Sequence, residues 1–327
     1  MRHLRRSRSP LKPLVRAGAL AALAGAFVVP LARRRLRVPT PLTVVAVGIA
    51  PAALAVLRPR TKGRDAAMFA LQMWAFTVVH ELPYDNPERL RGRLKVGYPI
   101  RADRVLGAGR LPSIRLQEAL SRPGEVRPLD RVLAAAHWAW FMEPHLALAW
   151  ILRRHDDRFV RAAGQMAATF DLGCAAYFAI PTAPPWWAAE HGAMDDQPTG
   201  QPGAGSPSLA VRRVMVEVGE RTWGRAWPRL YQSLGGNPWA AMPSLHFGTS
   251  LLAAKLLAET GPVAGAAGWA YALTLGFALV YLGEHYAVDL VAGAALVALV
   301  RRAEPLAQPA AVAVGELTTR LERIANG

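Results

Sequence analysis

Residues 241–300 read AMPSLHFGTSLLAAKLLAETGPVAGAAGWAYALTLGFALVYLGEHYAVDLVAGAALVALV. Three apolar blocks, Ala241–Ala258, Pro262–Leu282 and Tyr286–Val300, follow one another here with very short gaps. Within them stand one Lys, one Asp and one His, namely Lys255, Asp289 and His246. A helix crosses the hydrocarbon core, which is roughly 30 Å thick, with about 20 apolar residues. The stretch therefore predicts membrane-spanning helices and excludes a cytosolic or secreted soluble enzyme.

Other apolar segments extend this pattern toward the N-terminus. Three of them complete a predicted core of six spans, and they cover residues 66–82, 132–152 and 159–180. Two shorter ones, residues 17–32 and 41–57, predict an apolar hairpin that either crosses the membrane or lies in its interface. The expected fold is all-α, a polytopic membrane helical bundle with added interfacial helices. We expect three regions: a basic N-terminal segment at 1–65, an embedded core at 66–302 and a C-terminal tail at 303–327.

The basic charge of the chain is concentrated at its start. The net charge is +16, from 39 Lys and Arg against 23 Asp and Glu, and residues 1–64 contain fourteen of the basic residues and no acidic one. A basic excess around the first apolar segments is typical of membrane orientation, and no basic folded face indicates nucleic-acid binding. The single cysteine, Cys174, excludes a disulfide framework. Arg33–Arg35 follow the first apolar segment, so a cleavable signal peptide is not expected.

Short loops predict the orientation in the membrane. Arginines connect two predicted spans at Arg153–Arg161, and Arg301 and Arg302 follow the last span. Short basic loops face the cytoplasm. Residues 181–239 and 283–285 then lie on the outer face. We expect a multi-pass protein of the cytoplasmic membrane whose active site faces outward.

Two groups of ionisable residues lie at the predicted outer ends of consecutive spans. Pro243 and Ser244 favour a helix start, which places His246 in the first turn of a span. His285 and Asp289 are four residues apart, so they share one helical face within hydrogen-bonding reach. A carboxylate that holds one ring nitrogen of a His leaves the other free as a nucleophile or base. The alternative is a buried His–Asp pair whose mutual hydrogen bond has only a structural role, but ionisable groups at membrane depth are usually functional.

These residues resemble motifs of a known family. Pro243-Ser-Leu-His246 and His285-x-x-x-Asp289 are similar to the second and third motifs of the type 2 phosphatidic acid phosphatase superfamily, over about residues 66–302. Together with Thr182-Ala-Pro-Pro-Trp186, they look more like the branch of inositol-phosphorylceramide synthases and bacterial inositolphosphotransferase-like proteins. The superfamily's first motif has no clear counterpart here. Its Ser-Arg before the third-motif His is replaced by Ala278 and Leu279.

The resemblance implies a mechanism and a substrate class. His285 is expected to form a phosphohistidine, Asp289 to orient it and His246 to act as general acid and then general base. Ser244 is expected to cradle a phosphate oxygen. The substrate would be a lipid phosphate or phospholipid, with water or an alcohol such as inositol as acceptor, and no metal or organic cofactor is required.

The outer loop offers the remaining substrate contacts. Trp186, Arg225 and Arg229 are the predicted binding residues, and Arg212, Arg213 and Arg221 belong to the same set of cations. Taken singly, each arginine is better explained as a solvated or headgroup-contacting residue. As a set, they supply the positive charge that a phosphoryl transition state requires.

Other polar residues inside the spans leave alternatives open. For His137, Glu143, His145 and Asp171 we favour an interhelical polar contact, and a metal site is the alternative. A transporter or flippase that uses such residues as a proton relay is the second functional class. A non-catalytic membrane scaffold is the third, and the two histidines in register with an aspartate argue against it.

Overall fold

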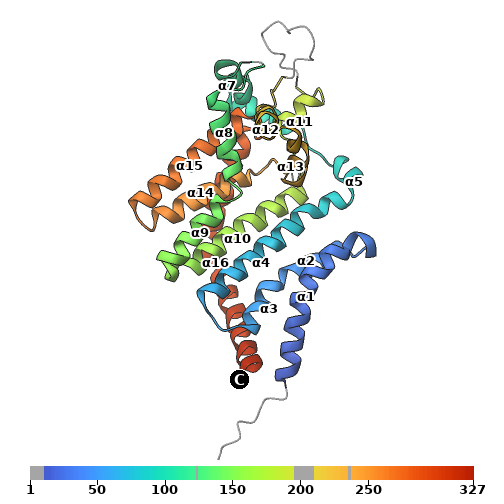
Figure 1. Ribbon diagram of the computed structural model, residues 1–327, viewed down its shortest axis with the longest axis vertical. Coiled ribbons are helices and arrows are strands. Elements are labelled where there is room, and N and C mark those ends of the chain that lie inside the picture. The colour runs from blue at the N-terminus through green and yellow to red at the C-terminus, as the bar shows by residue number, and fades with distance from the viewer. Residues whose placement is uncertain (1–10, 123, 195–209, 235–236) are drawn as a thin grey trace, which may run out of the picture. The chain divides into compact units, whose positions relative to one another are not determined.

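The computed structural model describes residues 11–122, 124–194, 210–234 and 237–327. Regular structure in these residues consists of α-helices and two short 3₁₀ helices (Figure 1). Their only β-type pairing is a pair of isolated bridges, which connect Lys95 to Thr182 and Thr182 to Ala240. The all-α prediction is therefore confirmed.

The chain divides into two compact units. Unit 1 contains residues 1–85, 152–167 and 301–327, and unit 2 contains residues 86–151 and 168–300. Three helices contribute residues to both units, and these are α9 (Glu143–Arg154), α10 (Asp156–Ala179) and α16 (Ala287–Asn326).

Unit 1 is built around four N-terminal helices. These are α1 (Lys12–Leu36), α2 (Thr40–Gly48), α3 (Ala50–Leu57) and α4 (Lys62–Glu81), and the short 3₁₀ helix η1 (Leu82–Asp85) follows. The indole nitrogen of Trp74 donates to the carbonyl oxygen of Ala26 at 2.9 Å, and its ring stacks on Phe27. A tryptophan of α4 thus fixes the position of α1, because its apolar ring and its donor are both satisfied there.

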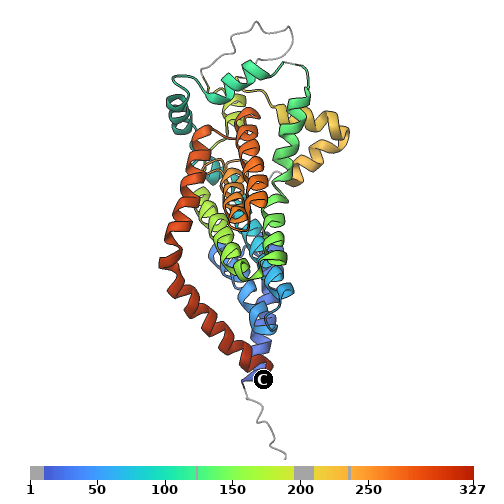
Figure 2. The ribbon, with the colours of Figure 1, turned by 90° about the vertical axis from the view of Figure 1, so that its left-hand side faces the viewer.

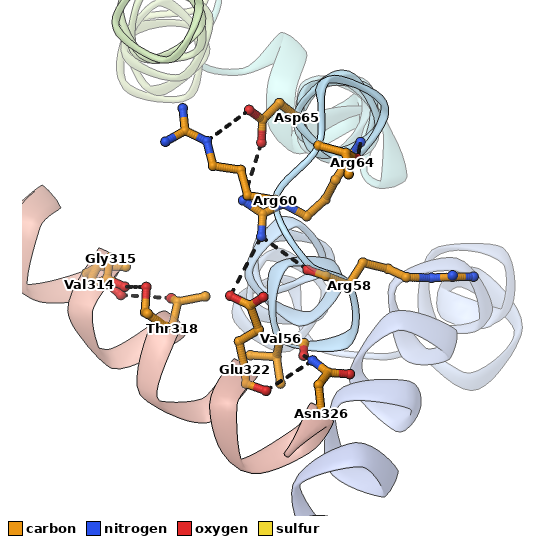
Figure 3. A network of polar contacts seen from close by, with 12 residues as sticks. Val56, Arg58, Arg60, Arg64, Asp65, Val314, Gly315, Thr318, Glu322 and Asn326 are labelled. Carbon is orange, nitrogen blue, oxygen red and sulfur yellow. Dashed lines mark hydrogen bonds and ion pairs between the residues drawn. The ribbon is translucent and has the colours of Figure 1, made fainter. Parts of the chain in front are cut away.

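The C-terminal end of α16 is also held in unit 1. The Asn326 amide donates to the carbonyl oxygen of Val56 at 3.2 Å. Arg64, whose side chain is 11% exposed, donates to the carbonyl oxygen of Arg58 and pairs with Glu322 at 3.9 Å (Figure 3). Residues 303–326, which carry these contacts, belong to the single helix α16, drawn in red in Figure 2.

Unit 2 contains most of the remaining helices. Besides parts of α9, α10 and α16, they are α5 (Pro87–Arg91), α6 (Gly97–Leu106), α7 (Pro112–Leu120), α8 (Pro128–Ala139), α11 (Pro185–Glu190), α12 (Val214–Trp223), η2 (Gly224–Ala226), α13 (Trp227–Leu234), α14 (Leu245–Ala258) and α15 (Pro262–Tyr281). Helices α14 and α15 pack along each other (Figure 1). Small residues permit this, since a Cβ on Gly268 would lie 2.8 Å from the Cα of Ala254.

Three helical segments of the described chain are long and apolar enough to cross a membrane. They are Lys12–Leu36, Thr40–Leu57 and Pro262–Tyr281. On the last of these, Val263 and Leu273 are 83% and 62% exposed. Large apolar side chains on the outside of a helix suit contact with lipid. The protein is a membrane protein, both arms of the predicted N-terminal hairpin have spanning length, and the count of six core spans stays a prediction.

The predicted span at 132–152 is not one continuous helix. It is divided into α8 and α9 by a turn at Trp140–Met142. The backbone amides of this turn bond to carbonyls three residues back, among them Trp140 to His137 at 3.2 Å. Pro144 explains the break, because proline has no amide hydrogen and its ring clashes with the carbonyl four residues earlier.

The loop helix that the sequence suggests near residues 208–232 is also divided. Helix α12 ends at Trp223, and α13 begins at Trp227. Gly224 between them has φ +51° and ψ −130°, a conformation that glycine adopts at little cost because it has no Cβ. The two tryptophans nevertheless meet at one place, because both contact the ring of Trp138.

Candidate active site

The start of α14 places His246. The Ser244 hydroxyl oxygen accepts a hydrogen bond from the amide of Phe247 at 3.2 Å, which makes Ser244 the N-cap of the helix. The Tyr177 hydroxyl donates to the carbonyl oxygen of Pro243 at 2.8 Å and accepts from the amide of Leu245 at 3.3 Å. Ser244 is fully buried. These contacts fix the first turn of α14, and with it the direction of the His246 side chain.

The start of α16 places His285 and Asp289. The Oδ2 atom of Asp289 lies 3.2 Å from Nδ1 of His285 and accepts the amide of Tyr286 at 2.9 Å. His285 is 3% exposed and Asp289 is 0% exposed. Gly283 has φ +74°, which lets the chain turn sharply after α15 into the α15–α16 loop, residues 283–286. The predicted contact between the two side chains is therefore present, but the predicted shared helical face is wrong, because α16 begins at Ala287 and His285 lies in the loop before it.

The two histidines meet directly, although they are far apart in the sequence. Nδ1 of His246 lies 3.1 Å from Nε2 of His285. Because Nδ1 of His285 faces a carboxylate, it carries a hydrogen, and its Nε2 then presents a lone pair that accepts from His246. His246, His285 and Asp289 therefore form one hydrogen-bonded line. A lone pair on a carboxylate-oriented imidazole beside a second imidazole can perform nucleophilic attack with acid–base assistance.

Two further residues of α8 and the following turn adjoin His246. The ring centroid of Trp140 lies 4.1 Å from that of His246, and the centroid of His137 lies 4.9 Å from it. His137 is 6% exposed, and its Nδ1 has no hydrogen-bond partner among the described residues. The sequence offers one signal for His137, a polar residue in an apolar segment. It offers none for the place of Trp140, since the direction in which the broken helix turns this residue depends on packing against α14.

Asp103 of α6 supports the start of α16 from another segment. It is fully buried, and its Oδ1 accepts the amide of Val288 at 2.9 Å. A carboxylate at this position accepts a hydrogen bond from a free amide of the first helical turn. Its negative charge also interacts favourably with the positive end of the helix dipole. Burial raises the pKa of Asp103 to about 6, and the hydrogen bond from Val288 opposes that rise. Nothing in the sequence pattern singles out this residue.

Trp186 lies beside the α15–α16 loop. Its amide donates to the carbonyl oxygen of Gly283 at 3.1 Å, and the Arg213 guanidinium lies 4.0 Å from the centre of its ring. Arg213 also pairs with Glu190. Burial raises the pKa of Glu284 to about 7, while the positive charge of Arg213 acts in the opposite direction. A carboxyl group that titrates near neutrality therefore stands next to His285 in the chain.

The other predicted binding arginines lie farther along the segment that the sequence assigns to the outer face. Arg225 is in η2 and Arg229 in α13, and both side chains are exposed. Arg213 instead contacts Trp186, whose amide bonds to Gly283 in the α15–α16 loop. Its position depends on Trp186 and Glu190, which come from a different helix, so sequence order alone does not distinguish it from its neighbours.

The described residues contain no group of three or more His, Cys, Asp and Glu side chains placed to hold a metal ion. His137 is directed toward His246, and Asp171 is exposed on α10. The alternative of a metal site at His137, Glu143, His145 and Asp171 therefore has no cluster to support it.

The fold and the site thus combine membrane-spanning helices with a His–His–Asp line near the starts of two neighbouring helices, an arrangement that suits phosphoryl transfer. Comparison with known families agrees, because the model of the PAP2 superfamily matches residues 104–302, more than half of the chain. The chain belongs to the PAP2 superfamily, and its activity is phosphatase-type phosphoryl transfer. Searches among curated proteins and among solved structures found no match.

Proposed function

We propose that this enzyme hydrolyses or transfers a phosphoryl group, or a phospho-alcohol group, of a lipid through a phosphohistidine at His285. The observation that carries the proposal is the continuous line from Asp289 through His285 to His246. It supplies a nucleophile, a carboxylate that orients it and a second imidazole that handles the proton.

The first half of the reaction forms the covalent intermediate. The Nε2 lone pair of His285 attacks phosphorus, and the bond from phosphorus to the leaving oxygen breaks. His246 gives its proton to that oxygen. His285 now carries a positive charge, which the carboxylate of Asp289 stabilises at 3.2 Å.

The second half returns the enzyme to its starting state. His246 accepts a proton from water or an alcohol, whose oxygen attacks phosphorus and breaks the bond to Nε2 of His285. The two imidazoles are 3.1 Å apart, which is too close to admit a phosphoryl group between them. Substrate binding must therefore separate the two histidines, and their mutual hydrogen bond is replaced by bonds to the substrate.

Substrate contacts come from four further residues in this proposal. Trp186 is favoured as a substrate contact because its backbone amide donates to Gly283, which places it beside the α15–α16 loop. Ser244 is favoured by its place at the N-terminus of α14, where helix dipole and amides attract anions. Arg225 and Arg229 are exposed cations of the same loop region, suited to attract an anionic headgroup.

A lipid substrate and an outward-facing site complete the proposal. Spanning helices place the enzyme within reach of lipid headgroups, and the arginines of 153–161 and 301–302 favour a cytoplasmic location for the opposite ends of the core helices. The acceptor is then water or an alcohol such as inositol, which approaches from outside the cytoplasmic membrane.

Turnover by the purified protein tests the function. A panel of lipid phosphates and phospholipids is incubated with the enzyme in detergent micelles, with and without inositol, and released phosphate and new lipid products are measured. We expect release of phosphate or formation of a phospho-alcohol product, and neither with His285→Ala. Absence of turnover on every lipid, together with lipid movement across vesicles containing the protein, would instead favour the transporter alternative.

A further inference from the structure

The break between α8 and α9 gives Trp140 a place that a continuous helix would not provide. Its ring centroid lies 4.1 Å from that of His246, with 45° between the ring planes. We propose that Trp140 is a positioning residue for the general acid, because its indole face holds the His246 ring and stabilises its protonated form. This inference rests on the function proposed above, in which His246 protonates the leaving oxygen.

Trp140 is anchored to the same helix that carries His246. Its indole nitrogen donates to the Thr249 hydroxyl oxygen at 2.9 Å, and that hydroxyl donates to the carbonyl oxygen of Leu245 at 2.6 Å. Thr249 is three residues after His246, so the indole lies along one turn of α14. Phe170 also contacts the indole, with the two ring centres 6.4 Å apart. The donor of the indole is thereby occupied, which leaves its face to contact the imidazole.

The contact favours one protonation state of His246. The face of an indole attracts a cation within about 6 Å of the ring centre, most strongly where water is excluded. His246 is neutral when it has given its proton away and positive when it holds the proton to be given. The indole therefore stabilises the state that precedes protonation of the leaving group.

The titratable groups around His246 do not offer its protonated form a comparable aromatic face. His137 stacks near it at 4.9 Å, and a positive charge there would repel one on His246. His285 accepts from it at 3.1 Å and is itself tied to Asp289. On the α9 side, Glu143 adjoins Ser250, whose hydroxyl donates to the carbonyl oxygen of His246. Among these neighbours, Trp140 offers a neutral aromatic face fixed by its own hydrogen bond.

Substrates with different leaving groups test the proposal. An alkyl phosphate ester needs its leaving oxygen protonated, whereas an aryl ester such as p-nitrophenyl phosphate leaves readily as an anion. We expect Trp140→Leu to lower kcat/KM for the alkyl ester about tenfold or more, an effect typical of weakened acid catalysis, and to change it less than about threefold for the aryl ester. Trp140→Phe keeps an aromatic face, so it should lower kcat/KM for the alkyl ester less than Trp140→Leu does. Thr249→Val removes only the hydrogen bond from the indole nitrogen, and it should also lower kcat/KM for the alkyl ester relative to kcat/KM for the aryl ester.

Trp138 provides the matched control. It lies two residues earlier, and its ring contacts Trp223 and Trp227 at centroid distances of 6.5 and 5.6 Å. Trp138→Leu should leave the ratio of the two kcat/KM values unchanged. Equal losses on both esters in Trp140→Leu and Trp140→Phe would overturn the proposal and indicate a structural role only. A wild-type enzyme inactive on the lipid panel, with and without inositol, as well as on both esters would overturn the proposed function itself, an outcome distinct from equal losses in the variants.

Discussion

The backbone amide of Ser244 donates a hydrogen bond to the carbonyl oxygen of Asp289, at 3.0 Å. Both residues are fully buried. This bond joins the start of α14 to the first turn of α16, so the two segments that carry the histidines are connected through the backbone as well as through side chains. The distance between His246 and His285 therefore depends on how closely the two helices approach.

Gly293 makes that approach possible. A Cβ at this position would lie 2.5 Å from the carbonyl oxygen of Ser244 and 3.4 Å from the amide of Gly248. Gly293→Ala should push α16 away from α14, lower the Tm in detergent and reduce kcat about tenfold or more, because catalysis depends on fixed geometry. Gly315→Ala is the control, since its Cβ meets nothing within 4 Å and alanine favours a helix. Equal Tm and kcat in the two variants would contradict the prediction.

Removal of the nucleophile should abolish turnover without unfolding the protein. His285→Ala loses the only group placed to form the covalent bond in the proposed mechanism. Asp289→Asn should reduce kcat by about 100-fold or more, because an amide neither orients the imidazole in the required tautomer nor stabilises its charge. Phosphate release is measured beside a thermal melt of each variant. Near-wild-type turnover by His285→Ala would show that another residue attacks phosphorus.

Activity should not depend on a divalent metal ion. In the proposed mechanism, two histidines, one carboxylate and nearby cations supply the nucleophile, the acid and the charge stabilisation. Dialysis against EDTA should leave the rate of phosphate release unchanged. Loss of activity on chelation, with recovery on adding one particular divalent ion, would point to a metal-dependent reaction instead.

The pH dependence of substrate binding should report on Glu284. Its pKa is raised to about 7, so this carboxyl group is mostly neutral below that pH and negative above it. A negative charge beside His285 repels a phosphate anion, and KM should therefore rise as the pH passes through 7. Glu284→Gln should lower KM about threefold above pH 7, the size of one screened charge interaction, and should have little effect at pH 5.5.

Glu220→Gln serves as the control for this pH series. Glu220 is an exposed carboxylate of α12, and its removal changes the charge of the protein by the same amount. KM measured from pH 5 to pH 9 should follow the wild-type curve in Glu220→Gln. If Glu284→Gln follows that curve as well, the charge of Glu284 does not reach the bound phosphate.

Two matched cysteine variants test the sidedness. Thr222 in α12 and Thr319 in α16 are both exposed, and each hydroxyl donates to the carbonyl four residues earlier. On a Cys174→Ser background, Thr222→Cys should react with a membrane-impermeant thiol reagent in intact cells, since it lies in the predicted outer loop. Thr319→Cys should react only after lysis. The reverse pattern would place the site on the cytoplasmic side and would refute the orientation drawn from the basic loops.

The sequence by itself determined the features that depend on local spacing and composition. Long apolar segments indicate a helical membrane protein, because hydrocarbon admits only backbones that satisfy their own hydrogen bonds. The interval between His285 and Asp289 predicts their contact, although His285 reaches the Asp289 carboxylate from the loop before α16 and not from a shared helical face. Ser244 likewise marks the start of α14, because its hydroxyl can cap a free amide.

Only the tertiary structure decided which distant residues meet at the site. His246 contacts His285 because α14 and α16 approach closely at Gly293, and no interval along the chain encodes that approach. Pro144 can be read in the sequence as a helix breaker, but the direction in which the broken helix turns Trp140 depends on packing against α14. Local hydrogen-bond geometry is set by neighbours in the chain, whereas contacts between helices are set by the shapes of complete packed surfaces.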